Sequence, residues 1–528
     1  MSAQFVPAIM WRHGAALTAN HPLTLAALCA AAHARAGDAV VIIDGELRLT
    51  WSDLLDRSGL LASHLKERIA PGNHVALILP NGVAHVLVEL AVWRLGAIAV
   101  PLFNGGGHNS GRELLAAQLR LAGPVLVVAS DPTEVPASYA VISSDTVLAL
   151  STAEKYESGV LAPWFPSAPD TPCLILFTSG STGEPRGVVL THGNLCSQQA
   201  AFAQLWPEIG PGDRLAAHLP WHHSFGSLAE RLWALCRGAT LTIVPGDGRD
   251  QPHLLAAMRA VRPTVVMTVP KLHRVLTRAN VLDTTVLRWV FTAGAALGAE
   301  ATGWYARHGV PLYEGWGLTE TSPSATITPP DRARHEGVVG EPIPGVSVGV
   351  ATDGHIFIAG PGVMRGYLGH PRLAQPCVDS GDCGAWTAHG LRLDGRADQV
   401  LKLSNGEKVA AAAIAGRLED QPGVRHAIVF ADDDRLIVLL AGAADALAAA
   451  VRTVNDAEPV IFRRIHRAYA VRVDVAEAGL LTPAHKLARG AWLAAFARWQ
   501  AGAAPGWCTL VAHDAGTHDT GAQDTRPT

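Results

Sequence analysis

The chain lacks several features that would place it in a class at once. Only seven of its 528 residues are cysteines, and no two have Cys-x-x-Cys spacing. An odd number without that spacing predicts free, buried thiols in a reducing compartment, so we expect a cytoplasmic protein. No block of Lys and Arg stands out against a formal net charge of −4, which argues against a nucleic-acid partner. No apolar run is long enough to span a bilayer, and the start, MSAQFVPAIMWRHG, lacks the pattern of a secretory signal.

The composition is that of a globular protein, with 49% hydrophobic and 17% charged residues. Its length suggests two or more domains. Short apolar runs alternate with segments of helical spacing, which predicts a mostly parallel sheet covered on both faces. Near residue 350 an alternating pattern turns at Asp-Gly and predicts a hairpin, and a smaller αβ segment follows Gly395. The clearest expected strands are 75–80, 173–177, 240–244, 264–269 and 289–294, and the first expected helices are 23–35 and 51–67.

The stretch FTSGSTGEPRGVVLTHG, residues 177–193, combines glycines, hydroxyl side chains and one cation between an apolar run and an expected helix. Glycines let backbone N–H groups turn toward an anion, and Arg186 is permanently charged. These features favour a phosphate site over a plain polar turn. The stretch contains neither the Walker A pattern nor the dinucleotide fingerprint G-x-G-x-x-G.

Taken as a whole, TSGSTGEPRGVVLTH resembles the phosphate-loop signature of the adenylate-forming superfamily, which includes acyl-CoA synthetases, luciferases and peptide-synthetase adenylation domains. Other motifs resemble further signatures of that superfamily and follow in its order: LTWSDLL (49–55), LPWHHSFG (219–226), EGWGLTETSP (314–323), SGDCGAW (380–386), DGRADQVLKLSNGEKV (394–409) and LTPAHKLAR (481–489). The chain departs from the signature at Arg186, where the family usually has lysine. The charge is kept, but the planar guanidinium has a different geometry.

The resemblance is to the acyl-CoA ligase branch. It implies an α/β fold with a large multi-layer N-terminal domain of mostly parallel sheets and a distorted β-barrel, plus a small mobile α+β C-terminal domain. We expect these domains at 1–396 and 397–512, followed by a loose tail at 513–528. The implied reaction uses ATP and Mg²⁺ to convert a small carboxylic acid to acyl-AMP, and then transfers the acyl group to coenzyme A. The expected assembly is a monomer or a homodimer.

The resemblance assigns four residues to the chemistry. Glu320 is expected to ligate Mg²⁺, because its carboxylate is a hard oxygen donor. Thr319 is expected to hydrogen-bond the α-phosphate, and Arg186 to hold the phosphates. Lys486 is expected to reach the reacting oxygens from the small domain. Outside their motifs, Glu320 and Lys486 would each be interpreted as an ordinary surface charge.

Further residues are assigned to the nucleotide. Trp316 is expected to lie against the adenine, Asp382 to accept both ribose hydroxyls, and Arg396 to help hold the ribose and phosphate side. The other expected nucleotide-binding residues are mostly small or hydroxylated: Thr178, Ser179, Gly180, Ser181, Thr182, Gly183, Gly294, Ala295, Glu314, Gly315 and Gly317.

The acyl pocket and the hinge complete the set. His223 is expected to gate the acyl pocket, with Phe225, Gly226 and Ala293 lining it. Asp398, two residues beyond Arg396, is expected to be the hinge about which the small domain swings.

Several alternatives stay open or are disfavoured by pattern. The acyl acceptor could be a carrier-protein phosphopantetheine or an amine, and the activated oxyanion could be nitrite. Histidines 218, 222 and 223 suggest zinc, but no Cys or carboxylate completes a four-ligand set at the usual spacing. GVSVG (345–349) matches the nucleophile elbow of hydrolases, yet strand and turn patterns follow Ser347 where a helix is needed. A degenerate scaffold is disfavoured because Glu320, Asp382 and Lys486 are all present.

Overall fold

The computed structural model describes residues 8–513 apart from 104–108, 153–160, 180–184, 247, 249, 296, 398–399, 403–407, 433–434, 461–462, 477, 482–486 and 505. The chain divides into two compact units. The N-terminal unit comprises Met1–Ser380 and Ala385–Leu393, and the C-terminal unit comprises Gly381–Gly384 and Asp394–Thr528. The boundary predicted after residue 396 separates two domains that move relative to each other. That boundary stays a prediction.

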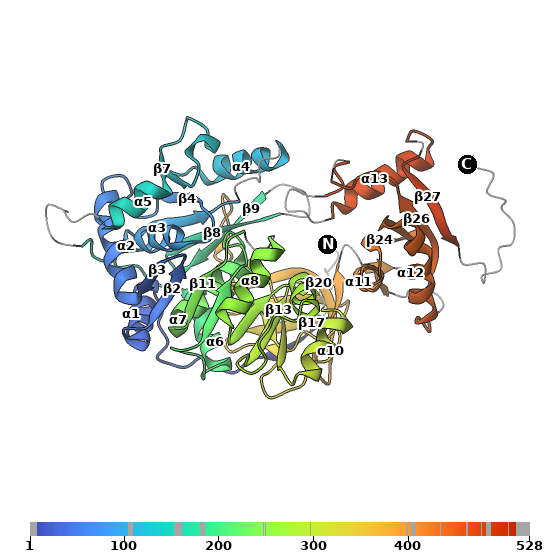
Figure 1. The fold of residues 1–528 in the computed structure, drawn as a ribbon, viewed down its shortest axis with the longest axis horizontal. Coiled ribbons are helices and arrows are strands. Elements are labelled where there is room, and N and C mark those ends of the chain that lie inside the picture. The colour runs from blue at the N-terminus through green and yellow to red at the C-terminus, as the bar shows by residue number, and fades with distance from the viewer. Residues whose placement is uncertain are drawn as a thin grey trace, which may run out of the picture. The chain divides into compact units, whose positions relative to one another are not determined.

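The largest sheet of the N-terminal unit has seven strands in the order β19-β9-β8-β5-β4-β6-β7. Figure 1 labels β4, β7, β8 and β9 of this sheet. The strands from β8 to β7 are parallel to their neighbours, whereas β9 pairs antiparallel with both β8 and β19. The apolar runs at 75–80 and 173–177 form β4 and β8, as predicted. The strands are β4 His74–Ile78, β5 Ile98–Pro101, β6 Leu126–Ala129, β7 Val141–Ser143, β8 Pro172–Ser179, β9 Pro185–Thr191 and β19 Gly366–Tyr367.

Two further sheets of this unit each have three parallel strands at one end and antiparallel pairing at the other. The order β10-β11-β2-β3 joins β10 Arg214–Ala217, β11 Thr240–Ile243, β2 Val40–Asp44 and β3 Leu47–Thr50. The order β12-β13-β14-β15-β16 joins β12 Val265–Thr268, β13 Trp289–Ala293, β14 Leu312–Trp316, β15 Thr326–Ile327 and β16 Glu341–Pro342. Strands β12, β13 and β14 are parallel, so the carboxyl ends of β13 and β14 meet at one edge of the sheet.

A fourth sheet, β1-β17-β18-β20-β21, contains the hairpin predicted near residue 350. Its strands are β1 Ile9–His13, β17 Ser347–Ala351, β18 His355–Ala359, β20 Cys377–Thr387 and β21 Gly390–Arg396. The division between the two units falls inside β20 and again inside β21.

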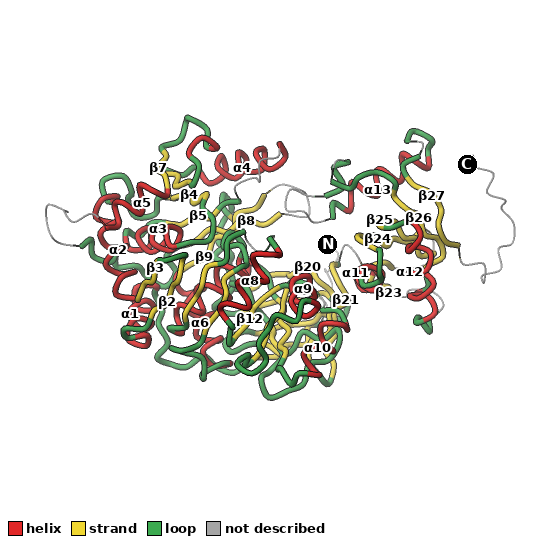
Figure 2. Tube along the Cα trace, in the orientation of Figure 1, coloured by secondary structure: helices red, strands yellow, loops and turns green. Residues whose placement is uncertain are grey.

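Helices flank the sheets of the N-terminal unit (Figure 2). Helix α3 buries all but one of its twelve residues: most are apolar, and the charged Glu89 and Arg94 are buried with them. Helices α2 and α6 start with capping boxes, Thr50 with Asp53 and Thr191 with Asn194. The helical segments are α1 Leu25–Ala36, α2 Trp51–Leu65, α3 Val83–Arg94, α4 Asn109–Ala122, η2 Pro132–Glu134, α5 Ser144–Thr152, α6 His192–Leu205, the π-helix η3 Phe225–Leu232, α7 Trp233–Arg237, α8 Gln251–Val261, α9 Pro270–Arg278, α10 Ala299–Arg307 and η4 Thr319–Thr321.

The C-terminal unit has its own four-stranded sheet, β24-β25-β26-β27, with separate apolar clusters packed on it. Its last strand was not predicted, and it extends to His513, where the tail was expected to begin. The elements are β22 Val400–Lys402, β23 Lys408–Ala410, α11 Ala411–Glu419, β24 Val424–Asp432, β25 Arg435–Gly442, α12 Ala444–Asp456, β26 Ile465–Val471, α13 Arg489–Gln500 and β27 Cys508–His513.

All seven cysteines lie in the described part of the chain, and all are buried or half-buried thiols outside disulfide bonds, as predicted. Among the residues that the structure describes, no helix combines the length and the apolar composition needed to cross a bilayer.

Candidate active site

The predicted phosphate loop lies at the end of the β8–β9 hairpin. Thr178 pairs with Arg186 and Ser179 pairs with Pro185, so the two strands remain in register up to the loop. The strand β9 that follows the loop was not predicted, and helix α6 begins only after it. Four of the expected phosphate-binding residues, Gly180, Ser181, Thr182 and Gly183, lie outside the described residues.

Arg186 and Glu320 are brought to the two sides of one tyrosine. The hydroxyl of Tyr367 donates a hydrogen bond of 2.8 Å to the Glu320 carboxylate, and the Arg186 guanidinium lies 5.8 Å from the centroid of the same ring. Tyr367 belongs to β19, which pairs with β9 beside the phosphate loop. A cation and a carboxylate from motifs far apart in the sequence therefore meet at this point.

The protonation state of Tyr367 supports this role as a donor. Burial and the neighbouring Glu320 carboxylate raise the pKa of Tyr367 to about 12, although Arg186 acts in the opposite direction. At neutral pH the phenol keeps its proton and directs it at Glu320. Tyr367 was missed by sequence reasoning, because nothing local in MRGYLGH marks that tyrosine as the neighbour of a carboxylate in another motif.

Thr319 joins this group to the predicted acyl-pocket loop. It stands with Glu320 in the short helix η4 after β14, and its hydroxyl lies 3.1 Å from the hydroxyl of Ser224. Ser224 directly precedes Phe225 and the π-helix η3. One hydrogen bond therefore joins η4, which contains Thr319 and Glu320, to the residue that directly precedes Phe225.

Aromatic rings line the start of the π-helix. The rings of His222 and His223 are 4.4 Å apart, and Phe103 lies 5.3 Å from His222. Phe225 is half-buried, and its ring meets the buried Phe291 of β13 edge-on at 5.6 Å. The expected pocket residue Gly226 is buried within the same turn.

The residues expected around the adenine lie on the carboxyl ends of β13 and β14. Gly294 and Ala295 are exposed directly after β13, and Trp316 is buried at the end of β14. Glu314 is buried and paired with Arg334. Burial raises the pKa of the Glu314 carboxyl, and Arg334 opposes that shift. Arg334 was not predicted, and the expected contact of Glu314 with the nucleotide stays a prediction.

Asp382 and Arg396 form an ion pair of 3.2 Å within the C-terminal unit. Gly381 precedes Asp382 with a φ of +67°, and a Cβ there would lie 2.6 Å from the Arg396 guanidinium. This backbone conformation favours glycine, and a larger residue there would require the end of the Arg396 side chain to shift. The expected hinge Asp398 and the expected catalytic Lys486 lie outside the described residues.

Two other sequence features have a definite place in the fold. His218 is buried and uses both ring nitrogens internally, at 2.7 Å from the Ala216 carbonyl and 2.7 Å from the Thr268 hydroxyl. Burial lowers its pKa to about 4, so this histidine is neutral at pH 7. Ser347 opens strand β17, and β18 follows it, so the hydrolase elbow is absent at this point of the described chain.

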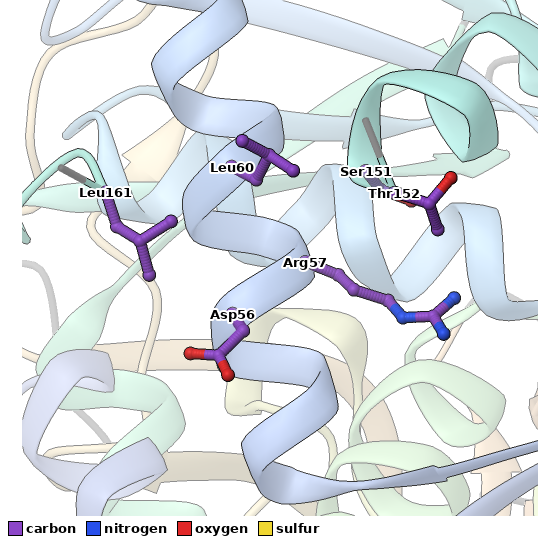
Figure 3. Close-up of a pocket in the computed structure, with 6 residues that line it drawn as sticks. All are labelled: Asp56, Arg57, Leu60, Ser151, Thr152 and Leu161. Atoms are coloured by element: carbon purple, nitrogen blue, oxygen red, sulfur yellow. The ribbon is translucent and has the colours of Figure 1, made fainter. Parts of the chain in front are cut away.

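A pocket of about 390 Å³ lies away from these groups, between α2 and α5 (Figure 3). It is lined by Asp56, Arg57, Leu60, Ser151, Thr152 and Leu161, none of which is an expected site residue. Residues 153–160, which connect two parts of its lining, are outside the described residues, and we assign the pocket no function.

Known proteins resemble the chain over most of its length. The family model of AMP-binding enzymes matches residues 29–368. A feruloyl-CoA synthase from Amycolatopsis sp. is 28% identical over 75% of this chain and 83% of its own length. Phosphinothricin tripeptide synthetase PhsC of Streptomyces viridochromogenes is 30% identical over 72% of this chain but only 37% of its own length. The ATP-bound structure of MatB from Rhodopseudomonas palustris, 24% identical, covers 84% of this chain and 94% of MatB with a TM-score of 0.72. This structural likeness confirms the predicted fold class.

Proposed function

The chain belongs to the AMP-binding enzyme family, the membership that its motifs predicted, and we propose that it is an ATP-dependent acid–coenzyme A ligase. The proposal is carried by the grouping of Arg186, Tyr367, Glu320 and Thr319 beside the expected acyl-pocket loop. Relatives named as CoA ligases or synthases, such as the feruloyl-CoA synthase, support coenzyme A as the acceptor.

The described residues fit a nucleotide bound with Mg²⁺. Arg186 provides a cation at the end of the β8–β9 hairpin, and Tyr367 fixes the Glu320 carboxylate through one oxygen. Mg²⁺ usually takes one or two protein carboxylates and completes its shell with phosphate oxygens and water, so a single glutamate suffices. When bound there, Mg²⁺ would neutralise phosphate charge and let an anionic acid approach.

The proposed reaction has two steps. An oxygen of the substrate carboxylate attacks the α-phosphorus of ATP, a P–O bond to pyrophosphate breaks, and acyl-AMP remains. The thiol sulfur of coenzyme A then loses its proton and attacks the acyl carbon, and AMP leaves. The hydroxyl of Thr319 donates a hydrogen bond to the α-phosphate. Lys486 stabilises the charge that develops on the reacting oxygens. Asp382 binds the ribose hydroxyls, and the small domain swings about Asp398 between the steps.

The acceptor and the compartment are part of the proposal. The alternative acceptor is a carrier-protein phosphopantetheine. It stays open because one relative, PhsC, is named as a peptide synthetase. We favour coenzyme A because the chain spans most of the feruloyl-CoA synthase but about a third of PhsC. Seven cysteines that form no disulfide favour a reducing compartment, the cytoplasm.

Adenylation predicts that the purified protein exchanges labelled pyrophosphate into ATP only when a suitable acid and Mg²⁺ are both present. A panel of short, long and aromatic acids, with nitrite included, covers the alternatives. With coenzyme A added, the acid that supports exchange should appear as its thioester. Silence across the panel would contradict adenylation. Exchange followed by transfer only to a carrier protein or an amine would contradict the choice of acceptor.

Tyr367→Phe is expected to raise the KM for Mg·ATP about tenfold, because a hydrogen bond to a charged group contributes roughly 1.5 kcal/mol or more. The variant keeps the ring beside Arg186 and removes only the hydroxyl that holds Glu320. Equilibrium binding of a non-hydrolysable ATP analogue, titrated with and without Mg²⁺, should show that the loss needs the metal. Tyr305→Phe is the matched control, because the hydroxyl of Tyr305 is hydrogen-bonded to His273 rather than to Glu320. An equal effect of the two variants would show that Tyr367 does not position Glu320.

A further inference from the structure

Two buried amide side chains lie on one face of α6, the helix that begins directly after strand β9. They are Asn194 and Gln198, which are four residues apart and only 7% and 2% exposed. The side-chain oxygen of Asn194 accepts a hydrogen bond of 2.9 Å from the backbone N–H of Thr191, the last residue of β9. This face of α6 is therefore attached to the strand that contains Arg186.

Gln198 holds the turn that follows Glu320. Its side-chain amide lies 3.2 Å from three backbone carbonyl oxygens, those of Thr321, Ser322 and Ser324. Because all three oxygens are acceptors, the NH₂ group of the amide is the part that faces them. A single side chain of α6 thus fixes the path of the backbone directly after the expected metal ligand.

This turn has a strained backbone. Ser322 is 0% exposed and has a φ of +66°, a left-handed conformation that residues other than glycine adopt only where the surrounding structure imposes it. The hydroxyl of Ser322 donates a hydrogen bond of 2.8 Å to the carbonyl of Gly362. A Cβ on Gly362 would lie 3.3 Å from the Thr321 carbonyl oxygen, so the two backbones are nearly in contact. The turn is therefore held from α6 on one side and from the loop around Gly362 on the other.

Asn194 holds that second loop, residues 360–364. Its NH₂ group donates hydrogen bonds of 2.7 Å to the carbonyl of Pro361 and 2.8 Å to the carbonyl of Val363. The next residue, Met364, donates its backbone N–H to the carbonyl of Glu320 at 2.8 Å. The loop that Asn194 fixes is thus bonded to the backbone of Glu320 itself.

The two amides act on both partners of one hydrogen bond. Gln198 fixes the backbone after Glu320, and Asn194 fixes the loop that leads to Tyr367, whose hydroxyl donates to the Glu320 carboxylate. We propose that Gln198 and Asn194 are positioning residues, which set the Glu320 carboxylate at the place where it binds Mg²⁺. This inference rests on the proposed function, because that function gives Glu320 its metal.

The test measures nucleotide binding rather than turnover. Gln198→Met keeps the length of the side chain and removes the donor. Titration with a non-hydrolysable ATP analogue should show an affinity about tenfold lower in the presence of Mg²⁺, because a group that orients a metal ligand typically contributes about 10–100-fold to metal affinity. Without Mg²⁺ the affinity should be nearly that of the wild type.

Gln199→Met is the matched control. Gln199 is the next residue of α6, is 3% exposed, and donates a hydrogen bond of 2.9 Å to the carbonyl of Leu228 in η3. Its loss removes an equally buried amide from the same helix without touching the turn after Glu320. The control should lower the stability of the fold and leave the Mg²⁺-dependent part of the affinity unchanged.

A double-variant cycle separates positioning from general destabilisation. Gln198→Met and Tyr367→Phe act on the same carboxylate, so their effects on Mg²⁺-dependent affinity should not combine independently. The double variant should lose at least about threefold less affinity than the product of the two single losses. Gln199→Met combined with Tyr367→Phe should give the product.

Two further variants keep the test decisive if Gln198→Met folds poorly. Ser322→Gly removes the hydroxyl that holds Gly362, and glycine readily adopts the left-handed conformation, so this variant should fold. Asn194→Asp keeps the acceptor for the Thr191 N–H and removes the donor to the loop. Each should lower the Mg²⁺-dependent affinity by about tenfold.

Unchanged Mg²⁺-dependent affinity in the folded variants, or equal losses from Gln198→Met and Gln199→Met, would overturn the inference. Failure of the wild-type protein to bind the analogue with Mg²⁺ would overturn it as well. The proposed function fails separately, if the wild-type protein binds the nucleotide with Mg²⁺ but catalyses no acid-dependent pyrophosphate exchange.

Discussion

Glu89→Leu is expected to lower the free energy of unfolding of the N-terminal unit by about 3–5 kcal/mol. Glu89 of α3 and Arg231 of the π-helix η3 form an ion pair with side chains that are 0% and 2% exposed. Removing one partner leaves the other charge buried without its counter-ion, and desolvation of that charge is no longer offset. Arg231 would keep its 2.8 Å hydrogen bond to Ser227 and its contact with the Trp221 ring, which replace only part of the loss.

Calorimetry and urea-induced unfolding should measure this change in the free energy of unfolding. The transition to compare is the one in which the N-terminal unit unfolds. Glu300→Leu is the matched control, because Glu300 pairs with Arg278 at the surface, where the side chains are 53% and 65% exposed. An exposed pair contributes about 0–1 kcal/mol. The double variant Glu89→Leu with Arg231→Met should recover much of the stability, since replacing both charges removes the desolvation cost. Equal losses from Glu89→Leu and Glu300→Leu would contradict this account of the pair.

Lys486→Ala is expected to slow acyl-AMP formation by about 10²–10³-fold, the usual cost of losing one donor aimed at charge that develops in the transition state. Attack of a carboxylate on the α-phosphorus brings two anions together, and the ammonium compensates the charge where it accumulates. Thioester formation from supplied acyl-AMP should proceed at nearly the wild-type rate, because its reacting centre is the acyl carbon.

Single-turnover measurements of each step on the same preparation separate the two rates. Lys271→Ala is the control, since Lys271 is an exposed residue of α9. It should leave both steps intact. If Lys486→Ala damages the two steps equally, the lysine has a structural function and the proposed assignment fails.

Much of the fold could be predicted because its signals are local. The run 75–80, the following helical segment and the glycine stop specify β4, α3 and β5 within thirty residues. The hairpin β17–β18 follows from alternation around Asp-Gly. The π-helix η3 has no such signal, since its sequence is compatible with an ordinary α-helix. Strand β27 is short and depends on pairing with β26, about forty residues earlier.

In the candidate site, too, the features that depend on long-range contacts could not be predicted. Motif order identified Arg186, Thr319 and Glu320, but the contacts that position them come from residues distant in sequence. Tyr367 is 47 residues from Glu320, and Ser224 is 95 residues from Thr319. Periodicity and propensity describe neighbours along the chain, whereas these contacts depend on which strands and loops the sheets bring to one edge. The phosphate-loop glycines, Asp398 and Lys486 lie outside the described residues, and their roles stay predictions.

The chain crosses between its two units inside β20 and again inside β21. These crossings affect where the sequences of two related enzymes can be joined by recombination. Gly381 to Gly384 group with the C-terminal unit, although Ala385–Leu393 return to the N-terminal one. A crossover placed after residue 396 would take Asp382 and Arg396 from one parent and the rest of the C-terminal unit from the other. A crossover before Gly381 transfers Gly381, the ion pair of Asp382 and Arg396, and the whole C-terminal unit together. Functional chimeras of this chain should therefore favour junctions before Gly381.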